Sequence, residues 1–368
     1  MREKIANRQL FYILFMMRTT VIIAFLPVLT TADARQDAWL AALVTLLTTT
    51  AIAILVAALG TRFPEQTVVE YGDQLLGPYL GKIPSLIILL ALLIIAATDV
   101  RVYCEMLVTS FLTETPIAFL IGIMVLIAAL GAQQGIEVLA RTADVIFPLF
   151  FLMLLGSLLL PLPEFRVSYL EPVLARGLGP ISRSSLTPTA IGAQLLILTI
   201  LIPNLNAPRL AIRTAFWATA GAGLVLIMAA FIVVGVLGPD LGARSIFPFY
   251  TMLRSIEISE FLQRVEAPII FAWGLGVFVS VSVIIYAGAR GFSQLLHLKD
   301  YRPLILPMAV IQGTYAFQGY DDVFQMIAFF RPRVVGLLVA TWFLLTLAPL
   351  YLGYLYRRLR PEKKRKGR

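Results

Sequence analysis

The sequence predicts an all-α membrane protein, and two features of the chain lead to that fold class. Hydrophobic residues make up 59% of its 368 residues, whereas charged residues make up only 14%. The apolar residues gather in runs that recur along the whole chain, and an α-helix needs roughly 20 such residues to cross a bilayer. A water-soluble domain could not bury this much apolar surface. Because no long polar stretch separates the runs, we expect one membrane domain of about ten transmembrane helices.

The expected spans lie between a short N-terminal segment, residues 1–8, and a basic C-terminal tail, residues 357–368, so the membrane domain covers residues 9–356. The first five spans are expected at residues 9–30, 38–59, 83–112, 117–132 and 143–161. The other five are expected at residues 189–203, 215–237, 261–287, 304–317 and 334–356. The first run resembles a signal peptide, but it is too long for one and contains Arg18, so we interpret it as the first span.

The Lys and Arg residues predict which ends of the spans face the cytoplasm. With the N-terminus placed inside, 19 of the 30 fall on inner segments, 9 on outer loops, counting Arg264 at the outer edge of the eighth span, and 2 deeper within spans. Positive residues favour the cytoplasmic side, so both termini are expected there. Eight of the 19 lie in the tail. Contact with the lipid bilayer explains this tail and the net charge of +9, and no nucleic-acid partner is expected.

A short amphipathic helix is expected on the cytoplasmic side between spans 2 and 3, over residues 67–81. Thr67 and Glu70 have the spacing of a capping box, in which each residue bonds the backbone of the other. Val68 and Leu75 belong to an apolar face at helical spacing, while Asp73 falls on the polar face. Such a helix either anchors the chain at the membrane interface or helps to gate a pathway.

Ionisable residues are concentrated in the third span, where contact with lipid would make each of them costly. Arg101 and Glu105 are four residues apart, the spacing of a structural ion pair within one helix. Asp99 and Tyr103 share a different face of the helix, and no partner for Asp99 stands at the same spacing. Asp99 is therefore a candidate to bind a ligand amine, a proton or a cation, unless Arg18 of the first span neutralises it.

The first and sixth spans both contain polar interruptions. Arg18, Thr19 and Thr20 lie near the middle of the first span, with Pro27 further along. The sixth span is short and ends in residues 203–208, a segment with two prolines and two asparagines. Paired interruptions at corresponding positions of two halves are typical of the binding site of secondary transporters. Ordinary proline punctuation at a loop remains the alternative for the sixth span.

Enzymes and metalloproteins are disfavoured by the small number of suitable side chains. The chain has one cysteine, Cys104, and one histidine, His297, so neither an intrachain disulfide nor a His/Cys metal cluster is expected. No catalytic constellation is evident either. We therefore expect no enzymatic activity, no metal and no cofactor.

Several separated motifs, in order along residues 9–358, resemble those of a known family. They are Leu26-Pro27, Asp37-Ala38-Trp39, Glu70-Tyr71, Leu76-Gly77, Leu80-Gly81, Asp99-Val100-Arg101, Glu105-Met106, Thr115-Pro116-Ile117, Asp144 with Phe147-Pro148, residues 170–174, residues 177–181 and Arg264-Val265-Glu266. This set resembles the endospore germination permeases, which are the B subunits of spore germinant receptors within the amino acid-polyamine-organocation superfamily.

The resemblance implies a fold and a role. The fold is a bundle of two inverted five-helix repeats, in which helices 1 and 6 are broken around a central small-molecule site. The implied role is a nutrient-sensing subunit of the spore inner membrane, which binds a small germinant, most often an amino acid, and triggers germination. The implied partners are an A-type membrane subunit and a C-type lipoprotein.

The chain departs from the superfamily at both helix breaks, where glycines are common. Thr20-Val21-Ile22 stands at the expected break of helix 1, and Gln194-Leu195-Leu196-Ile197 at that of helix 6. Without glycines a ligand carboxylate approaches the backbone less easily, so we expect Arg18, Thr19 or Thr20 to contact it. The full set of expected ligand-binding residues lies on spans 1, 3, 6 and 8: Arg18, Thr19, Thr20, Asp99, Tyr103, Gln194, Thr199, Ser280 and Ser282.

Two other functions fit the same residues. In an amino-acid transporter coupled to protons or cations, Asp99 and Glu105 would act as titrating relays. In a pore for water or ions, the polar faces of the third span would line the channel, although no repeated ring of charge supports this.

Overall fold

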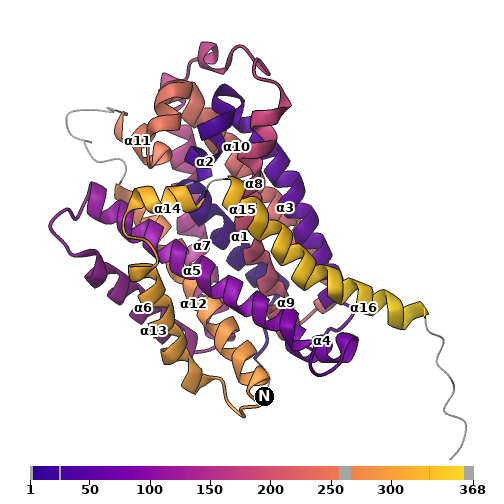
Figure 1. Cartoon of the computed structure of the whole chain (residues 1–368). Coiled ribbons are helices and arrows are strands. Elements are labelled where there is room, and N and C mark those ends of the chain that lie inside the picture. Colours follow the sequence, from indigo (N-terminus) through magenta and orange to yellow (C-terminus); the bar gives the residue numbers. More distant parts are fainter. Residues whose placement is uncertain (1–2, 25, 257–266, 331, 360–368) are drawn as a thin grey trace, which may run out of the picture.

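Ten crossing segments form the bundle in the computed structural model, which describes residues 3–24, 26–256, 267–330 and 332–359. The first crossing is made of two helices, α1 (Asn7–Ala24) and α2 (Leu26–Ala34). The next four are α3 (Ala38–Gly60), α5 (Lys82–Ser110), α6 (Ile117–Gln133) and α7 (Ile136–Leu159), with the short helix α4 (Val68–Leu76) between α3 and α5 (Figure 1).

The second half begins with an interrupted helix. It consists of α8 (Leu178–Ile191), the 3₁₀ stretch η4 (Gly192–Ile197), α9 (Leu198–Leu201) and the 3₁₀ turn η5 (Ile202–Asn204). The next three crossings are α10 (Ala211–Arg244), α12 (Ala267–Leu295) and α13 (Ile305–Gln318), with α11 (Pro248–Arg254) before α12. After α14 (Val323–Phe329), the tenth crossing comprises α15 (Pro332–Trp342), a π-helical turn over Phe343–Leu347, and α16 (Ala348–Leu359).

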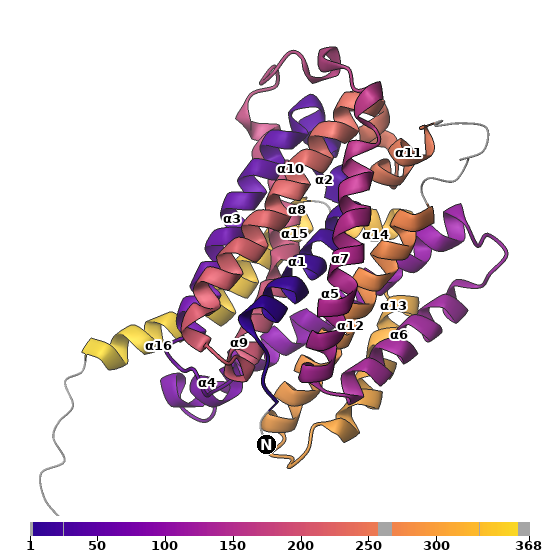
Figure 2. The same cartoon turned by 180° about the vertical axis from the view of Figure 1, so that it is seen from behind.

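The two halves correspond element by element, with opposite orientation. Each carries a short helix after its second crossing, α4 in the first half and α11 in the second. Both views place α4 at the end of the bundle where the N-terminus lies, and α11 at the opposite end (Figures 1 and 2). Repeats of inverted topology place equivalent elements in this way. The all-α class, the five-plus-five arrangement and the break in helix 6 are therefore confirmed.

The outer surface of the bundle has the character of a lipid-facing surface. Seven helices among the described residues are long and apolar enough to cross a membrane. Large apolar side chains point outward from several of them, for example Leu152 of α7, which is 67% exposed, and Leu337 of α15, which is 72% exposed. Exposed leucines of this kind are costly in water but favourable in a bilayer. The chain is an integral membrane protein.

The expected start of the sixth span at residue 189 is wrong, because α8 begins at Leu178. The added turns contain Ser184, Ser185 and Thr187, which lower the hydropathy, yet all three side chains are buried. Protein groups satisfy them: Ser184 Oγ accepts from the backbone N–H of Ala34 (3.1 Å), and Thr187 Oγ1 donates to the carbonyl of Phe330 (2.7 Å). A helix surrounded by protein does not need the apolar surface that the hydropathy pattern detects.

The expected break of helix 1 at Thr20-Val21-Ile22 is also wrong, because these residues lie inside α1, which continues to Ala24. Residue 25, between α1 and α2, lies outside the described residues. The break expected at Gln194-Leu195-Leu196-Ile197 is present, since the 3₁₀ stretch η4 contains these residues.

Other spans differ from the expectation mainly in length. The fifth crossing begins at Ile136, after Gly135 with a φ of 87°, rather than at residue 143. The seventh extends over Ala211–Arg244 and is kinked at Gly238. The eighth continues to Leu295, beyond the expected end at 287, while its expected start at 261 and Arg264-Val265-Glu266 lie outside the described residues. The tail from residue 360 lies outside them too.

Helix α4 lies where the amphipathic helix is expected, although it is shorter. Its capping box is formed, with the Thr67 N–H donating to Glu70 Oε2 at 2.8 Å. Thr67 Oγ1 also donates to Gln294 Oε1 of α12 (2.6 Å), which attaches α4 to the bundle. The helix ends at Leu76 rather than near residue 81, because Gly77 adopts a φ of 91° and turns the chain away.

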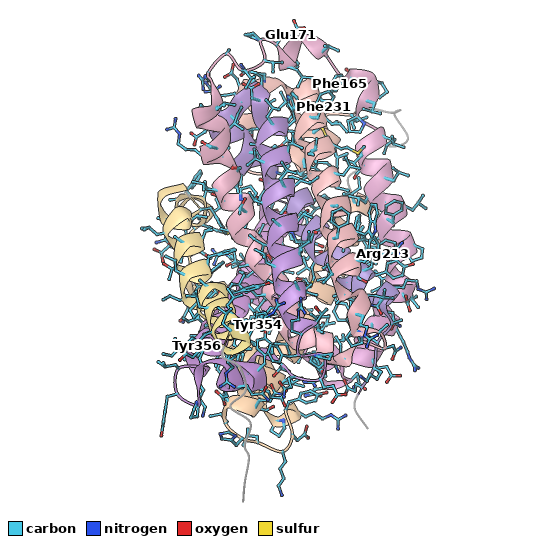
Figure 3. All side chains as sticks on the ribbon, turned by 90° about the vertical axis from the view of Figure 1, so that its right-hand side faces the viewer. Phe165, Glu171, Arg213, Phe231, Tyr354 and Tyr356 are labelled. Carbon is cyan, nitrogen blue, oxygen red and sulfur yellow. The ribbon has the colours of Figure 1, made fainter. Side chains whose placement is uncertain are left out.

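The loop between α7 and α8 packs on the end of the bundle opposite the N-terminus. Figure 3 shows Phe165 close to Phe231 of α10 near that end, with Glu171 beyond them, and Tyr354 and Tyr356 toward the other end. The two phenylalanine rings are stacked with centroids 5.0 Å apart. The Arg166 N–H donates to the carbonyl of Gly235 at 2.8 Å, and a side chain at Gly235 would collide with the Phe165 ring. The loop is therefore an ordered part of the fold.

Candidate functional site

Asp99 is the centre of a buried polar cluster formed by α5, η4 and α12. Its side chain is only 8% exposed and lies midway along α5. Oδ2 of Asp99 accepts hydrogen bonds from Gln194 Nε2 at 2.8 Å and from Ser280 Oγ at 3.4 Å. No hydrogen bond from a described residue reaches the other oxygen, Oδ1. Three distant parts of the sequence thus converge on one carboxylate that keeps an acceptor free.

Arg18 places a positive charge close to this carboxylate. It lies on α1, is 3% exposed, and its charge interacts with that of Asp99. Nevertheless Arg18 forms no hydrogen bond or ion pair with any residue that the structure describes, and its Nη1 is buried without a partner. Gln194 Oε1 is likewise buried and unpartnered. Buried polar groups normally have partners, so unpartnered ones beside Asp99 indicate a place for a polar ligand or water.

An apolar cavity of about 390 Å³ leads away from Asp99. Thr20 of α1 and Asp99 form part of its wall. The rest of the wall comes mainly from α5, α8 and the last crossings, and it includes the aromatic residues Trp273, Tyr315, Phe329, Phe330 and Trp342. The volume is in the range of small-molecule sites, which are commonly apolar with few polar groups.

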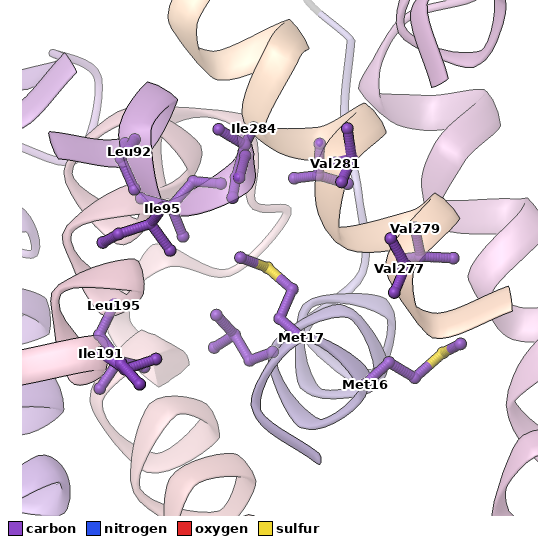
Figure 4. Packing of buried hydrophobic residues seen from close by; sticks show 14 of the residues in the cluster. Met16, Met17, Leu92, Ile95, Ile191, Leu195, Val277, Val279, Val281 and Ile284 are labelled. Atoms are coloured by element: carbon purple, nitrogen blue, oxygen red, sulfur yellow. The ribbon is translucent and has the colours of Figure 1, made fainter. Parts of the chain in front are cut away.

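The two methionines in the middle of α1 point in different directions. Figure 4 shows Met17 of α1 pointing toward Ile95 of α5 and Ile284 of α12, while Met16 points the other way, toward Val277. All of these side chains belong to one buried apolar cluster. Flexible methionine side chains fill irregular space of this kind well. Helix α1 packs mainly against α10, α12 and α7.

The structure brings only some of the expected site residues together. Asp99, Gln194 and Ser280 are joined by hydrogen bonds, and Thr20 lines the same cavity. Tyr103 stands one turn away and packs edge-on against Trp273, with ring centroids 5.2 Å apart. These residues keep their place in the candidate site.

Three expected residues, as the structure describes them, neither bond Asp99 nor line the cavity. The hydroxyl of Thr19 donates to the carbonyl of Phe15 (2.7 Å), and that of Thr199 to the carbonyl of Leu196 (2.7 Å), so both are bonded to nearby backbone. Ser282 lies beside Gly131 of α6, not beside Asp99. Side chains two residues apart on a helix point in nearly opposite directions, so Ser280 and Ser282 face different neighbours.

The aromatic wall was missed at the level of sequence. Trp273 and Trp342 lie within expected spans, but aromatic residues are common in membrane helices and their spacing there indicates nothing specific. Phe329 and Phe330 belong to the segment around α14, between the last two spans, which the hydropathy pattern leaves unassigned. Only the tertiary packing brings these rings around Asp99.

Arg101 and Glu105 form the ion pair that their spacing suggests, with Nε and Oε2 3.0 Å apart. Arg101 Nη1 also donates to the carbonyls of Ala316 (3.2 Å) and Phe317 (2.9 Å). These carbonyls are in the last turn of α13, where a helix leaves carbonyl groups unbonded and favours a cation. The pair therefore connects α5 to α13 and takes no part in the Asp99 cluster.

A second polar cluster holds the N-terminal segment beneath the broken helix 6. Glu3 Oε2 accepts from the N–H of Ile136 at the start of α7 (2.8 Å), and Glu3 Oε1 accepts from Tyr301 Oη (3.2 Å). Burial, and after it the charge of Glu3, raises the pKa of the Tyr301 hydroxyl, so Tyr301 remains a donor. Asn204 Nδ2 donates to the carbonyl of Glu3 (2.9 Å), and Asn204 Oδ1 accepts from Arg290 Nη1 (2.8 Å).

We expect Asn204→Ala to lower the free energy of unfolding by roughly 1–3 kcal/mol, because it leaves the half-buried Arg290 guanidinium and the Glu3 carbonyl each short of a partner. The measurement is unfolding of the purified chain by SDS added to a mild detergent, followed by tryptophan fluorescence. Asn206→Ala is the matched control, since the Asn206 side chain is exposed. Equal stability of the two variants would contradict the prediction.

Solved structures with the same fold define the class of this protein. Mhp1, a nucleobase-cation-symport-1 family transporter, matches with a TM-score of 0.71 and 12% identity over 100% of this chain and 82% of Mhp1. MhsT, solved in complex with L-phenylalanine, matches with a TM-score of 0.66 and 15% identity over 96% of this chain and 99% of MhsT. The fold is that of a secondary transporter.

Sequence relatives define the family within that class. Residues 4–318 match the spore permease family, whose members are described as spore germination proteins. Spore germination protein KB of Bacillus subtilis (strain 168) is 29% identical over 313 residues, which cover 84% of this chain and 83% of that protein. Spore germination protein YndE of the same organism is 25% identical over 291 residues, covering 78% of this chain and 80% of the relative. The chain belongs to the spore germination protein family, a family of membrane receptors and permeases rather than of enzymes.

Proposed function

We propose that this chain is the nutrient-sensing membrane subunit of a spore germinant receptor, and that binding of a small germinant, an amino acid, triggers germination. Membership of the spore germination family supports the role. The observation that carries the ligand class is Asp99, a buried carboxylate with a free oxygen at the end of a cavity. Such an oxygen accepts a hydrogen bond from a ligand ammonium group and neutralises its charge.

Arg18 is the proposed partner of the ligand carboxylate. It is the buried cation beside Asp99, and its Nη1 has no partner among the described residues. An amino acid carries one negative and one positive group, which complements this pair of buried charges. Pairing both groups offsets the cost of removing them from water. Thr20 and Ser280 add hydroxyl groups near Asp99, while Gln194 holds the carboxylate in place.

The broken helix 6 supplies the proposed route from binding to signal. Gln194 lies in η4, and η4 leads through α9 and η5 to Asn204, which contacts the N-terminal segment. A ligand that binds two conformations of this segment with different affinities shifts the equilibrium between them. We propose that an A-type membrane subunit and a C-type lipoprotein respond to that shift in the spore inner membrane, with both termini of this chain in the cytoplasm.

The alternative is an amino-acid transporter coupled to protons or cations, and the likeness of the fold to solved transporters favours it. The structure weakens one part of that idea, because Glu105 is bonded to Arg101 and stands apart from Asp99. A pore is less well supported, since the cavity wall beside Asp99 is largely apolar.

Deletion of the gene in its native host separates these functions. We expect mutant spores to lose germination in response to one nutrient of a panel, while vegetative cells take up that nutrient at the normal rate. The loss should be restored by the gene supplied in trans. Reduced uptake with normal germination would instead make the chain a transporter and would refute the receptor proposal.

A further inference from the structure

We infer that the ligand of the Asp99 site is an amine-bearing compound with a large apolar body, such as a branched or aromatic amino acid, and neither a small amino acid nor a sugar. This inference rests on the proposed function, because it concerns the same site. The chemistry of the cavity wall narrows the range of germinants that would fit the site.

The polar groups of the wall are few, and most already have partners. Thr20 Oγ1 donates to the carbonyl of Met16 (2.7 Å), and Thr98 Oγ1 donates to that of Ile94 (2.9 Å). Thr98 Oγ1 is also within 3.2 Å of Tyr320 Oη. Asp99 is the one charged residue in the wall of the cavity as the structure describes it. The wall therefore offers one position for a cationic group, at Asp99, and the proposed contact of Arg18 with a ligand carboxylate lies beside it.

The rest of the wall matches an apolar body. Trp273, Phe329, Phe330 and Trp342 present aromatic surface, and Ile95 and Ile191 add aliphatic surface. Aromatic and branched side chains gain most from contact with such surface. The hydroxyl groups of a sugar would lose their bonds to water here without finding replacements, so the wall discriminates against them.

The cavity is too large for a small amino acid to fill. A volume of about 390 Å³ is several times what one methyl side chain fills. With alanine bound, most of the apolar wall would face a void, which forfeits contacts, or water, which the wall cannot bond. A ligand with a larger apolar body covers more of this wall.

Two buried alanines provide positions at which the cavity can be made smaller. Ala91 of α5 and Ala190 of α8 both line it. Ala91→Leu would occupy part of the space of the ligand body without touching Asp99. Ala340→Leu is the matched control, because Ala340 is exposed on α15 and does not line the cavity.

The test is direct binding to the purified full-length chain in lipid nanodiscs, by the shift in thermal stability and by calorimetry. The probes are L-leucine, L-phenylalanine, L-alanine, D-glucose and 4-methylpentanoate, which has the leucine body without the amine. We expect leucine or phenylalanine to bind at least about tenfold more tightly than alanine, with no binding of glucose or 4-methylpentanoate. Ala91→Leu should weaken the large ligand at least about tenfold, and Ala340→Leu should not.

The outcomes distinguish this inference from the proposed function. Equal or tighter binding of alanine or glucose overturns the inference while leaving a receptor in place. Binding of none of the probes overturns it as well, and a lipid chain in the cavity would then be the simpler interpretation. If Ala91→Leu fails to fold, Ala190→Val makes a smaller change in the part of the wall that α8 forms, with the same expected direction. The proposed function itself fails only if deletion leaves germination unchanged.

Discussion

Asp99→Asn is expected to raise the germinant concentration for half-maximal germination by roughly 10- to 100-fold, with a normal amount of protein in the membrane. Asn has nearly the shape of Asp, so the packing of α5 against η4 and α12 remains. Its amide oxygen can still accept from Gln194 and Ser280, which directs the amide NH₂ group toward the cavity. The ligand ammonium then meets a donor in place of a negative acceptor.

The measurement is a dose response of spores that carry the variant as the sole copy, with the protein quantified by immunoblot. Ser280→Ala and Ser282→Ala form a matched pair on the same helix, because Ser280 bonds Asp99 and Ser282 faces α6. We expect a smaller shift for Ser280→Ala and none for Ser282→Ala. If Asp99→Asn removes the protein from the membrane, Asp99 has a structural role, and an unchanged dose response would remove it from the site.

Arg101→Leu is expected to lower the free energy of unfolding by roughly 3–5 kcal/mol, because it leaves a buried charge without its partner. Glu105, with a side chain only 12% exposed, would lose its counterion. The carbonyls of Ala316 and Phe317 would lose the donor that closes the end of α13. Lipid cannot replace the lost partner of the Glu105 carboxylate or of the two carbonyl groups.

The measurement is the SDS concentration at which half of the purified protein is unfolded. Arg141→Leu is the control, because Arg141 and Glu137 form an ion pair at the same i, i+4 spacing on α7 but with side chains 71% and 42% exposed. An exposed pair contributes about 1 kcal/mol or less. If the two variants lose the same stability, burial does not govern the ion pair of α5, and Arg101 is not the stabilising link between α5 and α13.

Local sequence patterns were sufficient to predict the fold class and much of the polar chemistry. Apolar runs of membrane-spanning length identify helices whichever way they pack, because the bilayer imposes that length on each of them separately. In the same way, local spacing predicted the capping box of α4 and the Arg101–Glu105 pair, since both depend on neighbours within one helix. Asp99 also stood out, because a carboxylate in a span always requires a partner or a function.

The set of residues that share the site depends instead on how distant segments pack. Gln194 and Ser280 reach Asp99 from positions 95 and 181 residues away, and nothing in local spacing distinguishes Ser280 from Ser282. The aromatic wall, the early start of α8 and the attachment of the N-terminal segment to Asn204 likewise depend on contacts between distant segments. Hydropathy measures the preference of each residue for lipid or water. A buried helix is surrounded by other helices instead, and only the tertiary packing determines which helices those are.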